Sequence, residues 1–143
     1  MSEIYRHALK LLSGRDYTTR ELREKIEKKF GSVDESVVAD LIKRKFLDDR
    51  RVVRNFAAKK ARYSIEYIHE RLLERGVDAK IVSEALRDAD RPSLRDVLDA
   101  TMADWKLRAP LHPRDAARLF RALGRLGYRE DAIREELEPL HEQ

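Results

Sequence analysis

A run of basic residues between Lys43 and Arg62 is the strongest chemical feature of this 143-residue sequence. It holds nine basic and two acidic side chains, a net of +7 over twenty residues, although the whole chain carries only +4. Positive charge concentrated in this way attracts phosphate groups or an acidic protein surface. The candidate binding residues are Lys43, Arg44, Lys45, Arg50, Arg51, Arg54, Lys59, Lys60 and Arg62.

Residue types that carry catalysis or bind metals are present, but not at the spacing that either task needs. The four histidines lie far apart, and His69-Glu70 lacks the second histidine that a zinc-protease helix requires four residues after the first. There is no cysteine and no glycine-rich phosphate loop. Acidic residues stand beside arginines at helical spacing, which is typical of solvated helix faces. The sequence therefore predicts no catalytic residue, no metal site and no cofactor.

The composition favours a basic protein that does not enter a membrane. The pI is about 9.4, no stretch approaches the ~20 apolar residues of a membrane span, and the first residues do not form a signal peptide. The absence of cysteine suits a reducing compartment. We expect a cytoplasmic protein.

Apolar residues recur at helical spacing along the whole chain, which predicts an all-α fold of nine short helices. Residues that cap or begin helices mark several starts: Thr18 with Glu21, Ser32 with Glu35, Asp48 or Asp49, Ser64, Asp78 and Pro113. The third helix is marked by Val37, Val38, Leu41 and Ile42, and the inward face of the fifth is expected to carry Ile65, Ile68, Leu72 and Leu73.

One pattern recurs three times: an amphipathic helix, a glycine, and a second amphipathic helix. The glycines are Gly31, Gly76 and Gly127, and each is followed by an aliphatic residue six positions on and a leucine ten positions on. The pattern predicts three tandem three-helix repeats that resemble helix-turn-helix units, over residues 1–47, 48–91 and 92–143. Units of this size cannot each bury a full core, so we expect them to stack into an elongated, curved array.

Three segments of the sequence resemble the bacterial RecX family. The first carries Ala8, Leu11, Leu12 and Arg15 ahead of TTREL; the second is FLDDRR from Phe46; the third is LLERGV from Leu72. Together they cover residues 8–90. The sequence departs from the family pattern at Val52-Val53, where Phe-Ala is usual, and at Tyr63-Ser64-Ile65, where a glycine is frequent. Both changes question the subfamily more than the fold.

The resemblance implies a regulator of the RecA recombinase that acts in DNA repair, recombination and the SOS response. Family members are all-helical arrays that lie along the groove of the RecA–DNA filament, and many block filament extension or suppress recombinase activity. They have no catalytic centre and no cofactor. For this chain the resemblance places the nine candidate residues against the filament or its DNA, with Arg50 in a motif that also caps a helix. We expect a monomer that binds single- or double-stranded DNA weakly when RecA is absent.

Two other functions fit the residues. A stand-alone DNA-binding protein would insert the basic helix over residues 50–62 into a major groove and would bind DNA tightly without RecA. A protein–protein adaptor would use the acidic C-terminal end, which carries a net −4 after Leu126, to meet a basic partner.

Overall fold

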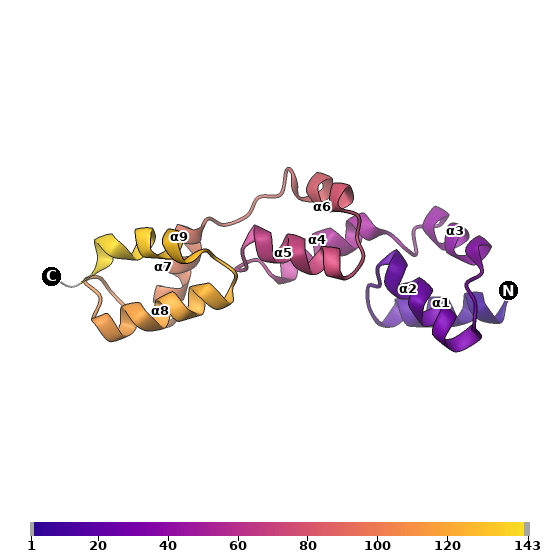
Figure 1. Cartoon of the computed structure of the whole chain (residues 1–143), viewed down its shortest axis with the longest axis horizontal. Helices are drawn as coiled ribbons and strands as arrows, with labels where there is room; N and C mark the ends of the chain where they lie inside the picture. The colour runs from indigo at the N-terminus through magenta and orange to yellow at the C-terminus, as the bar shows by residue number, and fades with distance from the viewer. Residues whose placement is uncertain (1, 142–143) are drawn as a thin grey trace. The chain divides into compact units, whose positions relative to one another are not determined.

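The computed structural model describes residues 2–141, and helices account for most of that stretch (Figure 1). Its α-helices are α1 (Glu3–Gly14), α2 (Thr19–Phe30), α3 (Glu35–Lys43), α4 (Asp49–Lys59), α5 (Ile65–Glu74), α6 (Ala79–Leu86), α7 (Leu94–Asp104), α8 (Pro113–Arg125) and α9 (Glu130–Leu137), and a 3₁₀ helix, η1 (Glu138–Leu140), follows. The described residues contain one isolated bridge, between Leu111 and His141, and no longer strand. The all-α prediction is confirmed.

The chain forms two compact units. Unit 1 contains the chain up to Lys59 together with His69–Ala89, and unit 2 contains Lys60–Ile68 together with the chain from Asp90 onward. Helix α5 therefore contributes residues to both units. The division into three repeats remains a prediction.

Unit 1 is built on aliphatic side chains from short amphipathic helices. Helices α1, α2 and α3 enclose a core that includes Leu22, Ile26 and Leu41, all without exposed surface. Helix α4 packs on α6, and the buried Val53 and Val82 are among the residues that these two helices withdraw from water. Burial of such side chains supplies most of the stability of helices this short, which are marginal in isolation.

Unit 2 has its own core, formed by α7, α8 and α9. Leu119, Leu123 and Ile133 are fully buried there, Met102 is buried, and Trp105 packs against the cluster while part of its surface stays exposed. Helices α8 and α9 lie side by side (Figure 1). One face of α8 is thus committed to the core, and its opposite face is left to solvent.

Most of the predicted helix starts are confirmed by backbone hydrogen bonds. Thr18 and Glu21 form the expected reciprocal capping box at the start of α2. Asp48 accepts hydrogen bonds from the backbone N–H groups of the next helix, and Ser64 and Asp78 do the same at α5 and α6.

The predicted cap at Ser32 is wrong. Helix α3 begins at Glu35, and its N-cap is Asp34, whose carboxylate accepts from the backbone N–H of Ser36 at 3.0 Å. Ser32 lies two residues before that position. A carboxylate at the N-cap also interacts favourably with the positive end of the helix dipole.

Three apolar side chains of α3 and α5 are exposed, and for Ile65 and Leu73 the expected inward position is wrong. Ile42, Ile65 and Leu73 keep 47%, 44% and 39% of their surface accessible. Ile42 and Leu73 each follow a leucine that is fully buried, and one residue along a helix turns the side chain by about 100°. The buried leucine therefore directs its neighbour away from the core.

Candidate nucleic-acid interface

The nine predicted binding residues fall into both units of the structure. Lys43 ends α3, Arg44 and Lys45 form the turn after it, and four more lie on α4, all within unit 1. Lys60 and Arg62 follow α4 and belong to unit 2. Two subsets can be distinguished within unit 1: basic side chains that hold the fold together and basic side chains that have no partner.

Arg51 is a structural residue. Its guanidinium donates to the carbonyl oxygens of Lys45 at 2.9 Å and Phe46 at 3.1 Å, and it lies 3.8 Å from a carboxylate oxygen of Asp16. Lys45 has a φ of 63°, a left-handed conformation that is unfavourable for a residue with a side chain. Arg51 therefore stabilises the turn that presents Lys45 and Phe46 at the surface.

Arg44 and Arg50 are also paired. Arg50 lies 2.8 Å from Glu84 of α6, and Arg44 lies 3.2 Å from Asp40 one turn earlier on α3. These carboxylates neutralise much of the charge that the sequence pattern counted as available for a partner.

The remaining basic residues of unit 1 within the predicted set are exposed, and their side chains have no hydrogen bond or ion pair with any described residue. These unpaired cations are Lys43, Lys45, Arg54 and Lys59. On α4, at about 100° per residue, Arg54 is about 140° from Lys59 around the helix axis. The two α4 cations are therefore spread around the solvent face of the helix and are not aligned along one side of it.

Lys59 borders a pocket that is rich in charge. The pocket, of ≈ 210 Å³, is also lined by Arg15, Asp16 and Arg75. Arg75 donates to both carboxylate oxygens of Glu21, at 2.9 and 3.1 Å. Partial burial alone would raise the pKa of Glu21, but the hydrogen bonds from Arg75 and from the Thr18 backbone outweigh it and lower that pKa.

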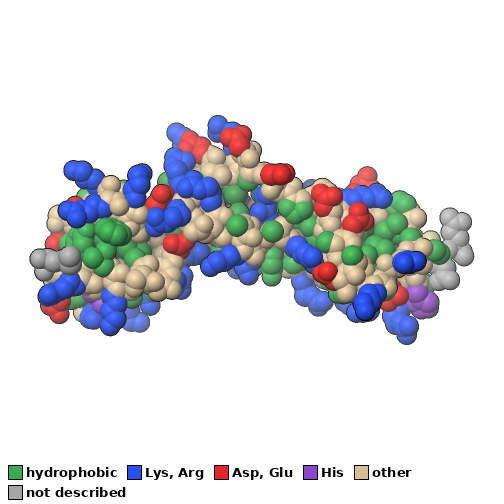
Figure 2. All heavy atoms as spheres, turned by 180° about the vertical axis from the view of Figure 1, so that it is seen from behind, with side chains coloured by type: hydrophobic (Ala, Val, Ile, Leu, Met, Phe, Trp, Pro, Cys, Tyr) green, Lys and Arg blue, Asp and Glu red, His purple; other side chains and the backbone are tan. Residues whose placement is uncertain are grey.

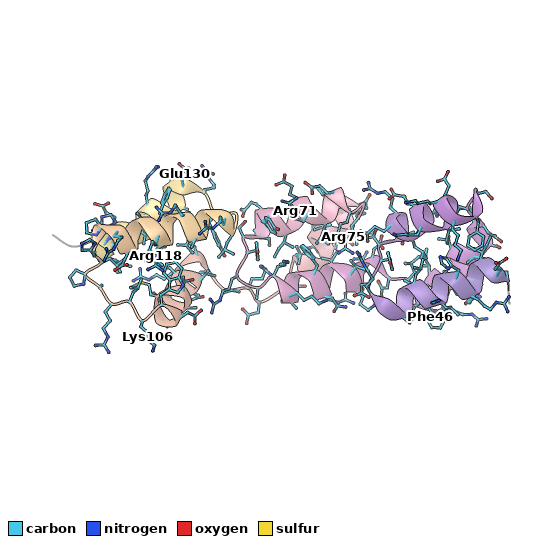
Figure 3. All side chains as sticks on the ribbon, turned by 90° about the horizontal axis from the view of Figure 1, so that it is seen from below. Phe46, Arg71, Arg75, Lys106, Arg118 and Glu130 are labelled. Carbon is cyan, nitrogen blue, oxygen red and sulfur yellow. The ribbon has the colours of Figure 1, made fainter. Side chains whose placement is uncertain are left out.

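An exposed aromatic ring lies beside the unpaired lysines. Phe46 keeps 45% of its surface accessible and follows Lys45 directly (Figure 3). Ile42, Ile81 and Lys45 line a nearby pocket of ≈ 350 Å³. An exposed phenyl ring next to cations can stack on a nucleobase or enter an apolar pocket of a partner. Sequence analysis did not include Phe46 among the candidate binding residues, although Lys45 directly precedes it.

The two predicted residues in unit 2 are both engaged locally. Lys60 lies over the ring of Tyr63, with its ammonium 5.0 Å from the ring centroid. Arg62 lies 2.6 Å from Asp104. Ion pairing leaves Arg62 less available to a partner than its place in the basic run suggested.

Comparison with known proteins identifies the family. No protein-family model matches the chain. The regulatory protein RecX of Trichlorobacter lovleyi is 31% identical to it over 94% of this chain and 93% of that protein. The regulatory protein RecX of Thermus thermophilus is 33% identical over 89% of this chain and 84% of that protein. The chain belongs to the RecX family.

The structure agrees with this assignment at the level of the fold. A crystal structure of RecX from Lactobacillus salivarius matches 96% of each chain with a TM-score of 0.70 at 17% sequence identity. The resemblance to RecX that the three sequence segments indicated is confirmed.

Two further observations on this RecX family chain concern metal binding and membranes. No group of three or more acidic or histidine side chains within residues 2–141 is arranged to hold a metal ion. Across the same residues, every helix is too short or too polar to cross a membrane.

Sequence analysis of the RecX family chain also missed a second group of basic residues. Four arginines of α8 share one exposed face in unit 2: Arg114, Arg118, Arg121 and Arg125. Their spacing of four, three and four residues was visible in the sequence. It went unnoticed because the net charge of the C-terminal third is close to zero.

Proposed function

We propose that this protein is a non-enzymatic regulator of the RecA recombinase. It binds the RecA–DNA filament along its groove in the cytoplasm, as a monomer, and limits filament extension and the recombinase and ATPase activities that depend on it. The observation that carries this proposal is membership of a family whose curated members are named regulatory protein RecX.

The proposed contact includes the predicted basic residues, with a division of labour that the side-chain contacts support. Lys43, Lys45, Arg54 and Lys59 have charge available for DNA phosphates or acidic residues of the filament. Arg51 acts by positioning the turn that carries Lys45 and Phe46. Binding energy alone, without a chemical step, would block subunit addition.

The test is the single-stranded-DNA-dependent ATPase of RecA, measured while this protein is titrated in. The informative variant is Lys43→Glu/Arg54→Glu/Lys59→Glu, because these side chains have no partner within the described residues and their replacement leaves the fold intact. The matched control is Arg6→Glu/Lys10→Glu/Lys28→Glu, which makes the same charge change at exposed positions of α1 and α2.

We expect the wild type and the control to inhibit below one molecule per RecA subunit. The variant should need a concentration higher by on the order of tenfold or more, since several charge contacts are reversed. Equal loss in the variant and the control would show that net charge, and not this surface, matters. No inhibition by the wild type would refute the regulator proposal.

A second candidate function is supported by the solvent face of α4. Arg54 and Lys59 lie on an exposed helix with no carboxylate partner in the described structure, as a helix that enters a DNA groove requires. A stand-alone DNA-binding protein would leave RecA ATPase unchanged and bind duplex DNA tightly by itself. Its affinity would fall steeply with salt, and the α4 charge reversal would abolish it.

A further inference from the structure

A second concentration of positive charge lies in unit 2, between Lys106 and Arg129. It holds seven basic residues and one acidic residue, a net of +6 over 24 residues. Unit 2 as a whole has twelve basic and twelve acidic residues, so its net charge is zero. Basic side chains are visible along the lower edge of this unit, at the right of Figure 2. The charge is therefore gathered on one part of the unit's surface.

Helix α8 arranges four of these residues as a stripe, the α8 arginine stripe: Arg114, Arg118, Arg121 and Arg125. At about 100° per residue they fall within an arc of about 60° around the helix axis. At about 1.5 Å per residue they span about 16.5 Å along it. The opposite face of α8 carries the buried Ala116, Leu119 and Leu123, so packing against the core aims the arginines at solvent.

The stripe is largely free of internal partners. Arg114, Arg121 and Arg125 are exposed, and their guanidinium groups have no hydrogen bond or ion pair with any described residue. Arg118 lies 4.5 Å from the ring centroid of Trp105 and 3.6 Å from Asp115, which holds it over the end of α7 (Figure 3). One face therefore presents three guanidinium groups without a partner among the described residues and one that is held by Trp105 and Asp115.

The residues next to the stripe have small side chains or none. Ala117 and Gly124 are both exposed, one helical turn or less from the arginines. A Cβ atom at Gly124 would meet nothing within 4 Å, so packing does not require the glycine. Glycine inside a helix costs about 1 kcal/mol relative to alanine. A common reason for a glycine without a packing role is the close approach of a ligand to the backbone.

We propose that the α8 arginine stripe binds the sugar–phosphate backbone of a nucleic acid strand. Each strand of a duplex carries one phosphate per about 3.4 Å of axis, so a 16.5 Å stripe faces about five of them. Arginine binds phosphate oxygens with its planar fork, and Gly124 and Ala117 leave room for the backbone to approach. This surface extends the proposed function, because it provides a second contact with the DNA of the filament.

The test measures binding to bare DNA, so that it can fail while the RecA ATPase test succeeds. Fluorescence anisotropy with a labelled oligonucleotide, single-stranded and duplex, is followed from ~50 to ~200 mM salt. In the variant Arg121→Gln/Arg125→Gln we expect the Kd at low salt to rise on the order of tenfold. The slope of log K against log salt should flatten by about 1.5, since each lost phosphate contact removes about 0.7–0.9.

Two further variants separate this proposal from a loss of fold or of bulk charge. Gly124→Leu adds bulk but no charge at an open helical position, so we expect unchanged or higher thermal stability with a Kd raised about threefold or more. Arg6→Gln/Lys10→Gln on α1 removes the same charge elsewhere and should leave the salt slope unchanged. An unchanged slope in Arg121→Gln/Arg125→Gln would overturn the proposal. Lost RecA inhibition with normal DNA binding would also overturn it and would assign the stripe to a protein surface.

Discussion

Two turns of this molecule use the same backbone device with different side chains around it. In unit 1 the buried hydroxyl of Thr18, which caps α2, donates to the carbonyl oxygen of Arg75 at 2.7 Å, next to the left-handed Gly76. In unit 2 the buried hydroxyl of Ser64, which caps α5, donates to the carbonyl oxygen of Gly127 at 3.0 Å. Each N-cap hydroxyl therefore accepts from a backbone N–H group of its own helix and donates to a carbonyl oxygen in a glycine turn 57 or 63 residues away.

The side chains around the two turns differ. The Thr18 turn is reinforced by the ion pair of Arg75 with Glu21, and Arg20 donates to the carbonyl oxygen of Glu74. The Ser64 turn is surrounded by aromatic rings: Tyr63 and Tyr67 stack with their centroids 4.5 Å apart. The capping hydroxyl and the glycine are thus common to both turns, whereas the side chains around them differ in charge and in aromatic character.

The largest expected effect comes from the glycines. A Cβ at Gly76 would lie 2.7 Å from the Cβ of Arg20, and one at Gly127 would lie 2.8 Å from the Cβ of Tyr67, whereas one at Gly31 meets nothing within 4 Å. All three have a positive φ. We expect Gly76→Ala and Gly127→Ala to lower the free energy of unfolding by about 3–4 kcal/mol, and Gly31→Ala by about 1–2 kcal/mol.

Urea unfolding followed by circular dichroism measures these differences. Gly31→Ala is the matched control, because it carries the conformational cost without the clash. Equal destabilisation by all three variants would show that the close contacts at Gly76 and Gly127 add nothing to the cost of a side chain at a left-handed position.

The second effect concerns the buried hydroxyls. Thr18→Val and Ser64→Ala each remove a helix cap and leave a carbonyl oxygen without its donor, so we expect a loss of about 2–3 kcal/mol. Ser2→Ala removes only a cap, since the hydroxyl of Ser2 accepts from Tyr5 at the exposed start of α1, and should cost about 1 kcal/mol. Thermal unfolding of the three variants compares them. If Ser2→Ala proves as costly as the others, the hydrogen bonds to Arg75 and Gly127 contribute nothing.

The smallest effect is a pH dependence of stability that we expect for the Thr18 turn and not for the Ser64 turn. Because the pKa of Glu21 is lower in the folded chain than in the unfolded one, its ionised form stabilises the fold above the unfolded pKa of about 4.3. This stabilisation is lost as the pH falls through the folded pKa. Glu21→Gln should therefore cost about 1 kcal/mol at pH 7, a figure reduced for the partial exposure of the pair, and less than that at pH 3.

Urea unfolding at the two pH values gives this difference directly. Glu135→Gln, an exposed change on α9 in unit 2, serves as the control and should be neutral at both. A cost for Glu21→Gln that is the same at pH 3 and pH 7 would mean that the carboxylate charge does not hold the Thr18 turn.

Much of the helical framework could be predicted from local patterns. The capping box of Thr18 and Glu21 and the glycines at Gly31, Gly76 and Gly127 specify backbone geometry through atoms a few residues apart, so the sequence shows them directly. The side of each helix that becomes buried was less accessible. Ile42 and Leu73 have the same hydrophobicity as their buried neighbours, and only the position of the packing helices separates them.

The candidate site shows the same limit. Sequence analysis found the basic run between Lys43 and Arg62, but it could not tell Arg54, which is unpaired, from Arg50, which pairs with Glu84. The second basic surface on α8 was missed because acidic residues elsewhere in unit 2 cancel its charge in any count over the whole segment.

The all-α class, most of the helix starts, the glycine that follows a helix in each repeat of the pattern and the resemblance to the RecX family could be taken from the amino-acid sequence alone. These follow from interactions within one or two helical turns and from residue types at fixed spacing. Which cations remain available to a partner depends on the tertiary fold. An arginine is neutralised by a carboxylate that the fold brings to it from far along the chain, as Glu84 is brought to Arg50 from 34 residues away.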